Sequence, residues 1–193
     1  MSLLLPKTEA PEIETRRLRL RQMHASDEAA FHSVLSDKQV VDQTSWPLCA
    51  TLPEARDVMN QMNSKVTNGS GLYWGIASKH DDQLIGYIGL TNFSNTELRS
   101  GSTFAIATGQ WGLGYASEAL VAAVSYGFTT VGLNRIQAYV FVDNPASAKV
   151  LSNSGFQLEG RHRDYFRDHR GFHDLELFAI LHRDFTAAAA AVR

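Results

Sequence analysis

A glycine-rich stretch in the second half of the chain has the residue types and spacing needed to bind an anion. It runs Gln110-Trp111-Gly112-Leu113-Gly114-Tyr115-Ala116-Ser117-Glu118-Ala119-Leu120. Glycines let the main chain approach a ligand closely because they have no Cβ atom. The first N–H groups of a helix have no partner within the helix, and the helix dipole adds partial positive charge there. A phosphate or pyrophosphate is therefore the ligand that this loop favours.

The elements that must position this loop are a strand before it and a helix after it. Residues 102–107 are apolar or β-branched, which predicts a strand. After the loop, apolar residues recur at steps of three and four, which predicts an amphipathic helix with one buried face. These apolar positions are Ala116, Ala119, Leu120, Ala123, Val124, Phe128 and Val131.

Two known phosphate-binding motifs match this loop incompletely. A P-loop requires a Lys after its second glycine, and residues 110–120 contain none. A dinucleotide fingerprint requires a third glycine, where this chain has Ser117, and an acidic residue about 20 positions later; Asp143 comes too late. Taken by themselves, the glycines are also compatible with an ordinary tight turn.

A second motif, at residues 144–156, accompanies the loop. It runs Asn144-Pro145-Ala146-Ser147-Ala148-Lys149-Val150-Leu151-Ser152-Asn153-Ser154-Gly155-Phe156. Together the two motifs resemble those of the GNAT superfamily of acyl-CoA-dependent N-acetyltransferases, in the branch of the ribosomal-protein N-terminal (alanine/serine) acetyltransferases. The segments at 14–21 and 171–177 also resemble that branch. The resemblance extends from about residue 14 to about residue 184. Its motifs are specific for fold and cofactor but not for the acceptor.

The resemblance implies one α/β domain with the GNAT acyl-CoA N-acyltransferase fold. We expect a mixed, mostly antiparallel sheet of six to seven strands with a V-shaped split and flanking helices. Residues 14–185 should form this domain, between a flexible N-terminal segment (1–13) and an Ala-rich C-terminal tail (186–193) that we expect to be a frayed helix. The implied co-substrate is acetyl-CoA. A homodimer is also possible, since relatives are often dimers.

Cofactor-binding residues follow from the resemblance. The main chain of Phe104, Ala105 and Ile106 should pair with the pantetheine arm, and one N–H there should polarise the thioester carbonyl, an oxyanion-type contribution. The pyrophosphate should be held by main-chain N–H groups of Trp111, Gly112, Leu113, Gly114, Tyr115, Ala116 and Ser117. The family consensus has Gln or Arg where this chain has Trp111, which removes a side-chain contribution to phosphate binding. Gln110 is one place out of register and does not replace it.

Asn144 and Ser147 are the candidate catalytic residues. Asn144 with Pro145 after it predicts a helix N-cap, and Gly155 predicts the end of that helix. The resemblance implies that Asn144 also bonds the pantetheine, and that Ser147 protonates the departing thiolate. A plain serine on the helix surface is an equal alternative for Ser147.

No general base is assigned. The position at which many relatives carry Glu is Gly101, and Glu97 is out of register with it. Asp174 matches a family acid, but it is equally suited to hold the last strands together. An acceptor amine with a lowered pKa would need only water as its base.

Two tryptophans are candidates for acceptor binding by the resemblance, Trp46 and Trp74. For Trp46, simple hydrophobic packing is an equal alternative. The alternating residues 17–21 predict a half-buried strand whose arginines form a solvated face. Residues 72–78 and 84–90 predict a hairpin. The basic run 161–170 predicts a solvated hairpin face, although it could also contact an acidic acceptor or the CoA phosphates.

Composition sets limits on the partners. The 193 residues are 44% hydrophobic and 20% charged, which is ordinary for a globular domain. A net charge of −2 gives no reason to expect nucleic acid or an anionic membrane. No stretch approaches the length of a membrane span. The single Cys, Cys49, and the absence of an obvious leader favour the cytoplasm. Seven scattered His show no metal-ligand spacing, so we expect no metal.

The predicted function is acetyl-CoA-dependent N-acetylation by direct transfer to a primary amine. A protein N-terminus, a lysine and a small amine all remain open as acceptors. The alternative is a non-catalytic acyl-CoA-binding module, because Gly101 replaces the acid of many relatives. A nucleotide-binding regulatory domain is a third interpretation, based on the incomplete dinucleotide fingerprint.

Overall fold

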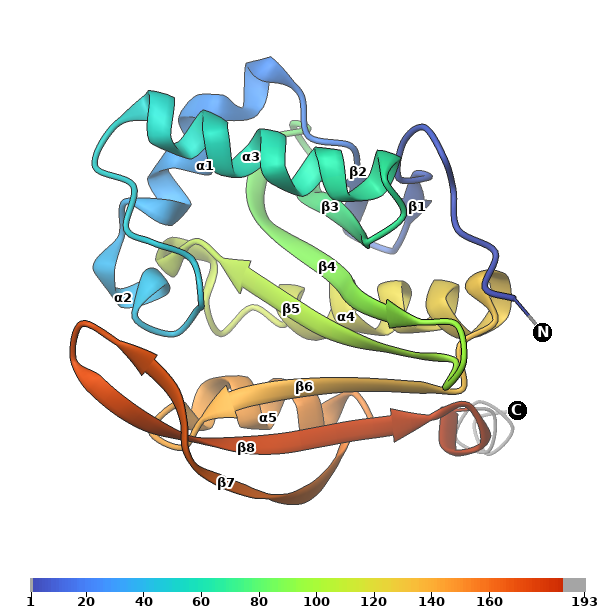
Figure 1. Cartoon of the computed structure of the whole chain (residues 1–193). Helices are drawn as coiled ribbons and strands as arrows, with labels where there is room; N and C mark the ends of the chain where they lie inside the picture. Colours follow the sequence, from blue (N-terminus) through green and yellow to red (C-terminus); the bar gives the residue numbers. More distant parts are fainter. Residues whose placement is uncertain (1, 186–193) are drawn as a thin grey trace.

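A single mixed sheet forms the centre of the computed structural model, which describes residues 2–185 (Figure 1). Its eight strands have the order β1-β2-β3-β4-β5-β6-β8-β7. They are β1 (Ile13–Glu14), β2 (Leu18–Arg21), β3 (Gly71–Ser78), β4 (Leu84–Ser94), β5 (Arg99–Ile106), β6 (Arg135–Phe141), β7 (Gln157–Asp168) and β8 (Gly171–Leu181). The predicted fold class is confirmed. The strand count is eight rather than six to seven, because the two residues of β1 add a short edge strand beside β2.

The helices are α1 (Glu28–Leu35), α2 (Lys38–Val41), α3 (Leu52–Thr67), α4 (Tyr115–Tyr126) and α5 (Pro145–Asn153). A capping box begins α3, with Thr51 as the N-cap and Glu54 bonded back to its N–H. Ser26 does not cap α1, although its residue type and the two acidic residues after it are typical of a helix start. A 3₁₀ turn occupies residues 25–27 and α1 begins after it, because the Asp27 carboxylate accepts the His24 N–H and holds this turn in place. Within residues 2–185, no helix is both long enough and apolar enough to cross a membrane.

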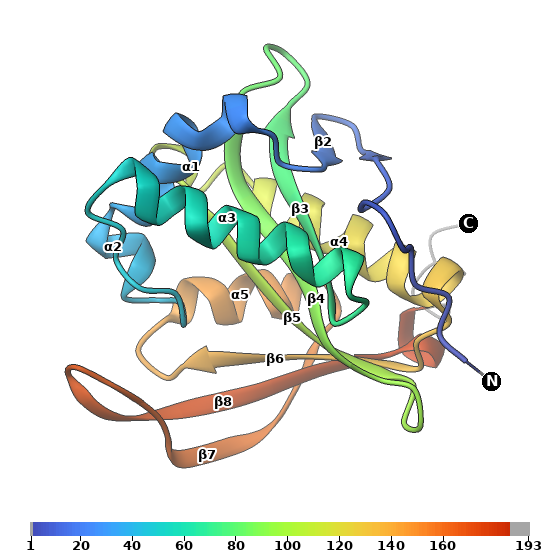
Figure 2. The same ribbon diagram turned by 45° about the horizontal axis from the view of Figure 1, so that its top comes forward.

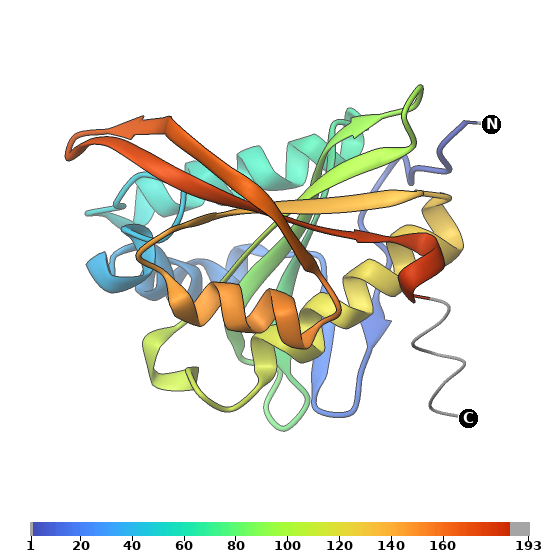
Figure 3. The ribbon, with the colours of Figure 1, turned by 90° about the horizontal axis from the view of Figure 1, so that it is seen from below.

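Helices cover both faces of the sheet (Figures 2 and 3). One face packs against α4 and α5, where residues such as Leu120 and Leu151 join the larger hydrophobic cluster. The opposite face packs against α1 and α3, where residues such as Phe31 and Met62 form the second cluster. Alternate residues of a strand point to opposite faces. In β6, Ile136 and the other residues packed on α4 and α5 therefore alternate with residues that face the α3 side.

The sheet splits between β5 and β6, the only parallel pair of strands recorded within residues 2–185. These strands pair only at Arg99–Arg135, Ser100–Ile136 and Gly101–Gln137. Beyond Gly101, β5 continues its pairing with β4, and β6 continues with β8. The two strands therefore diverge and open a V-shaped gap, which in Figure 1 widens toward the left, where both strands end. The predicted split is present.

The N-terminal segment packs on the domain, in contrast to the expected loose surface segment. Leu3 and Ala10 are buried, and the Leu4 N–H donates to the Val131 carbonyl at 2.9 Å. The Pro11 carbonyl accepts a 2.7 Å hydrogen bond from the Trp74 indole. The predicted tail helix at 186–193 lies outside the described residues.

The arginines of β2 are not a simple solvated face, which corrects the prediction. Arg21 is mostly buried and forms a bidentate pair with Asp27 at 2.7 and 2.9 Å. Arg19 lies among Glu12, Glu14 and Asp82. The basic run 161–170 forms much of β7 and the turn after it, so it lies on a hairpin as predicted. Arg161 pairs with Asp174 of β8, and Arg170 pairs with Asp168.

Candidate active site

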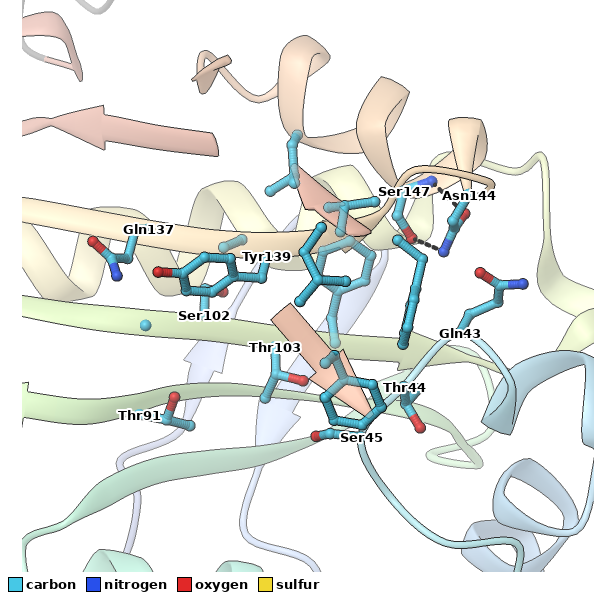
Figure 4. Close-up of a pocket in the computed structure, with 18 of the residues that line it drawn as sticks. Gln43, Thr44, Ser45, Thr91, Ser102, Thr103, Gln137, Tyr139, Asn144 and Ser147 are labelled. Atoms are coloured by element: carbon cyan, nitrogen blue, oxygen red, sulfur yellow. Dashed lines mark hydrogen bonds between the residues drawn. The ribbon is translucent and has the colours of Figure 1, made fainter. Parts of the chain in front are cut away.

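A cavity of about 660 Å³ lies where β5 and β6 diverge (Figure 4). Its walls come from five parts of the chain: the end of β4, the split strands, the connection after α2, the helix α5, and the β7–β8 hairpin. They include Thr44, Ser102, Thr103, Phe104, Gln137, Tyr139, Asn144, Ser147 and Phe166. The residues of the split and the second motif, which are distant in sequence, are thus brought to one site.

The glycine loop leads from β5 into α4 with the geometry that an anion site needs. Gly112 and Gly114 have φ of 76° and 80°, in the left-handed region that other residues rarely adopt. No atom lies within 4 Å of the position that a Cβ of Gly112 would take. Gly114 is the N-cap of α4 and no side chain caps the helix, so the N–H groups of its first turn are left for a ligand. These residues fit a diphosphate.

Trp111 contributes to the loop differently from the prediction. Its main-chain N–H donates to the Thr108 carbonyl at 3.1 Å, so this donor is already occupied. Its indole Nε1 donates to the Ile106 carbonyl at 2.7 Å, while about half of the side chain stays exposed. Trp111 therefore fastens the loop to the end of β5, and the free donors begin after it.

Hydrogen bonding in β5 shows which main-chain groups face the split. The Ala107 N–H donates to the Ile85 carbonyl of the β4 strand at 2.9 Å. Main-chain groups alternate in direction along a strand. The N–H of Ala105 therefore points to β4, which corrects its predicted role in pairing with the cofactor. The N–H groups of Phe104 and Ile106 point into the split, and Phe104 also lines the cavity.

Arg17 is a residue of the site that the sequence analysis missed. Its Nη1 donates to the Leu113 carbonyl at 2.9 Å, and its Nε donates to Glu118 at 2.7 Å. The guanidinium lies 4.5 Å from the centre of the Tyr115 ring. Arg17 lies 96 residues before Leu113 in the sequence, and its side chain nevertheless contacts the glycine loop directly. Only the three-dimensional arrangement could reveal this contact.

Asn144 and Ser147 are hydrogen-bonded to each other at the start of α5 (Figure 4). The Ser147 N–H donates to Asn144 Oδ1 at 3.0 Å, which fixes the orientation of the amide because an N–H can only donate. Asn144 Nδ2 then donates to Ser147 Oγ at 2.9 Å. The hydroxyl proton of Ser147 must therefore point elsewhere, and both residues line the cavity. The predicted cap is present, and the arrangement leaves Ser147 free to act as a proton donor.

The acidic residues considered as bases are engaged elsewhere. Glu97 pairs with Arg99 at the surface. Asp174 accepts hydrogen bonds from the Asp164 N–H and the Arg161 guanidinium, both at 2.8 Å, and these bonds lower its pKa. It therefore holds β7 and β8 together. No Asp, Glu or His is among the residues that line the cavity in the described part of the chain.

Two tyrosines that the sequence analysis did not single out line the cavity. Tyr139 of β6 and Tyr165 of β7 stack with ring centres 5.0 Å apart, and their hydroxyls are separated by 3.4 Å. The Tyr165 hydroxyl and partial burial raise the pKa of Tyr139. Tyr139 and Gln137 lie two residues apart in β6, so they share the face of the strand that lines the cavity.

The two tryptophans predicted to bind the acceptor lie in different surroundings. Trp46 packs on the cluster of α1 and α3 and lines a second cavity of about 490 Å³. Trp74 is completely buried on the face of the sheet that packs against α4 and α5, and its indole N–H donates to the Pro11 carbonyl. This position argues against a role for Trp74 in acceptor binding. Cys49 is buried, and burial raises the pKa of its thiol.

Comparisons with known proteins agree with this geometry. An acetyltransferase (GNAT) domain model matches residues 17–157. The chain is 32% identical over 171 residues to an uncharacterized N-acetyltransferase, p20, of Bacillus licheniformis, with 89% of this chain and 96% of that protein covered. It is 31% identical over 134 residues to the [ribosomal protein uS5]-alanine N-acetyltransferase of Escherichia coli, with 66% of each chain covered.

A solved structure shows the same fold. Mycobacterium smegmatis RimJ, determined in complex with CoA-disulfide, superposes with a TM-score of 0.79 at 22% identity, covering 96% of this chain and 98% of that one. The resemblance predicted from the two motifs is confirmed, and membership of this family supports acetyl-CoA as the co-substrate. The chain belongs to the GNAT family of acetyltransferases.

Proposed function

We propose that this acetyltransferase acts on the α-amine of a protein or peptide N-terminus. The observation that carries the proposal is the chemistry of the cavity, which holds hydroxyl, amide and aromatic groups and no Asp, Glu or His among its described lining residues. The E. coli relative named as a ribosomal-protein alanine N-acetyltransferase supports the same acceptor class.

The absence of carboxylates from the cavity wall disfavours polyamines. A polyamine brings several ammonium groups, and each buried cation requires an opposite charge to offset its lost hydration. Arg99 is the charged side chain among the described lining residues, and its ion pair with Glu97 leaves no free carboxylate on this wall to receive an ammonium group. A peptide N-terminus brings a single amine followed by neutral amides, which hydroxyls and amides can bond.

The absence of a base from the cavity wall favours an amine with a low pKa. An α-amine has a pKa of about 7.7–8.0, so about a quarter of it is neutral near pH 7.4. A lysine or polyamine amine, with a pKa of about 10.4, is neutral in about one molecule in a thousand. Only the neutral amine can attack the thioester. A site without a carboxylate or imidazole base therefore suits the α-amine best.

Room for the rest of a peptide lies beside the main cavity. The second cavity shares Thr44, Ser45 and Phe166 with the first, so the two lie next to each other. Its walls include Trp46 and Leu48, on the connection between α2 and α3. A peptide whose first residue occupies the main cavity can therefore continue past Ser45, with Trp46 along its path.

Catalysis then requires two actions from the protein. The amine nitrogen attacks the thioester carbonyl, whose developing negative charge would be stabilised by the Phe104 N–H that faces the split. The carbon–sulfur bond then breaks, and the thiolate takes the proton of the Ser147 hydroxyl. The nitrogen of the new amide loses its extra proton, and Ser147 regains a proton from solvent. Asn144 holds Ser147 in position for this step through two hydrogen bonds.

A thiol-release assay with acetyl-CoA tests the acceptor class. Peptides beginning with Ala or Ser should be acetylated, and the same peptides with a blocked N-terminus and an internal Lys should not. Spermidine and an aminoglycoside serve as competing small amines. Turnover of spermidine together with no turnover of any free-N-terminus peptide would overturn the proposal.

A further inference from the structure

A bulge interrupts the pairing of β7 with β8 beside the main cavity. Regular pairing stops at His162 and resumes at Phe166, so residues 163–165 of β7 lie opposite the single residue Asp174 of β8. Within the bulge, Asp164 has a φ of 50°, in the left-handed region. Extra residues of this kind bend a strand and change the direction of a side chain, and they are common beside active sites.

The bulge turns Tyr165 toward the cavity. Residues an odd number of positions apart in a regular strand point to opposite faces, so Tyr165 would point away from His162. Both side chains instead pack on Tyr139, with ring centres 5.0 Å away for Tyr165 and 5.5 Å away for His162. Because β8 lies between β6 and β7 in the sheet, Tyr165 reaches across β8 to make this contact. The irregularity of β7 therefore supplies a side chain of the cavity wall.

The Asp174 carboxylate holds the bulge in place. Its Oδ1 accepts the Asp164 N–H at 2.8 Å, and its Oδ2 accepts a 2.8 Å hydrogen bond from Arg161 Nε, just before the bulge. The left-handed conformation is unfavourable for a residue with a Cβ atom, so the bulge needs such bonds to persist. Asp174 itself is not among the described residues that line either cavity. Its effect on the cavity therefore acts through Tyr165.

The stacked pair of Tyr139 and Tyr165 lies on the face of the sheet away from the cofactor loop. In β6, Tyr139 alternates with Ala138 and Val140, which join the cluster packed on α4 and α5. The glycine loop that fits the diphosphate begins α4, on that same face. A cofactor arm that enters from α4 leaves the opposite face of the split for the amine, and Tyr139 lines the cavity there together with Gln137 (Figure 4).

We propose that Asp174 is a positioning residue for acceptor binding, which holds Tyr165 against Tyr139 so that the two phenols form a wall that contacts the acceptor. This role rests on the proposed function, since it assigns the wall to the acceptor peptide. The two side chains are 38% and 54% exposed, so a ligand can reach them. Their hydroxyls lie 3.4 Å apart. One hydroxyl can donate to the other, and the remaining proton and lone pairs can bond a peptide amide.

Steady-state kinetics of Asp174→Ala tests this role. The KM for the acceptor should rise about tenfold, because the bulge relaxes and the wall loses Tyr165, while the KM for acetyl-CoA should not change. Asp174→Asn keeps an oxygen that can accept the Asp164 N–H, so it should restore most of the acceptor affinity. Glu159→Gln is the matched control, because it removes an ion pair of β7 with Arg135 outside residues 163–165. It should leave both KM values unchanged.

A double-mutant cycle separates positioning of Tyr165 from a general weakening of the hairpin. Tyr165→Ala should raise the acceptor KM at least as much as Asp174→Ala, and the double variant should be no worse than Tyr165→Ala. An unchanged acceptor KM in Asp174→Ala, or effects that multiply in the double variant, would overturn the proposal. If Asp174→Ala does not fold, an unchanged acceptor KM in Tyr165→Ala, which alters an exposed side chain, overturns it instead. The cycle uses whichever amine the wild-type enzyme acetylates, so a failure of the peptide proposal remains distinguishable.

Discussion

Arg17 donates a 2.7 Å hydrogen bond from Nε to Glu118 Oε2, which joins the start of β2 to the first turn of α4. Glu118 also accepts hydrogen bonds from the Thr15 hydroxyl at 2.6 Å and the Arg17 N–H at 2.7 Å. Burial alone would raise the pKa of Glu118, but the bonds from Thr15 and Arg17 outweigh it, so the pKa is lowered and the carboxylate stays charged. A carboxylate beside a phosphate site would repel the ligand. The Arg17 guanidinium offsets the negative charge of Glu118 and so reduces this repulsion.

Arg17→Gln should therefore weaken CoA binding. The change removes a cation near the loop and leaves the Glu118 carboxylate unpaired, and both effects act against a diphosphate. We expect the Kd for CoA to rise about tenfold, equivalent to about 1.4 kcal/mol. Isothermal titration calorimetry measures this change. Arg19→Gln, two residues further along the chain but paired with Glu14 and Asp82, should bind CoA normally. Equal Kd values for all three proteins would contradict the assigned role.

Local sequence signals predicted the parts of this site that local chemistry determines. The turn at Gly112 and Gly114 and the helix cap at Asn144 each depend on a few adjacent residues, and both are present in the structure. The split between β5 and β6 followed from the family resemblance. For the glycine turn and the helix cap, the residues that determine the local conformation all lie within the motif itself.

Contacts between distant segments could not be predicted in this way. The alternation of residues 17–21 separates two faces of a strand, but it does not say that Glu118 will lie beside Arg17. Trp74 was assigned to the acceptor site, whereas strand alternation places its indole on the opposite face, where Pro11 bonds it.

Gly112→Ala should impair cofactor binding more than it impairs folding. A Cβ at φ 76° strains the loop and enters the space from which the main chain would meet the diphosphate. We expect a loss of about 1 kcal/mol in unfolding free energy and at least a tenfold higher KM for acetyl-CoA. Gly109→Ala is the control, because Gly109 has ordinary φ and open space around it. Similar KM values for both variants would show that the loop does not contact the cofactor.

Ser147→Ala should lower kcat while leaving acetyl-CoA binding nearly intact. Loss of the hydroxyl removes the proton donor to the thiolate, a step that contributes about a hundredfold or more in general acid catalysis. Steady-state kinetics with varied acetyl-CoA separates kcat from KM. Ser152→Ala changes an exposed serine of the same helix and should behave as wild type. A Ser147→Ala enzyme with wild-type kcat would mean that this serine is only part of the helix cap.

Asp27→Asn should destabilise the fold in a pH-dependent way. Burial tends to raise the pKa of Asp27, but the Arg21 guanidinium and the His24 N–H outweigh burial and lower it. A lowered folded-state pKa means that the carboxylate stabilises the fold above its unfolded pKa of about 3.9, and that this contribution disappears as the pH falls further. Because the pair is mostly buried, we expect the variant to lose about 3 kcal/mol near pH 7. Urea unfolding at pH 7, 5 and 3.5 should show this difference shrinking only at the lowest pH. Asp57→Asn, at an exposed position of α3, should change stability by less than about 0.5 kcal/mol at every pH. A difference between Asp27→Asn and wild type that is constant over this range would show that the negative charge of Asp27 is not what joins β2 to the turn before α1.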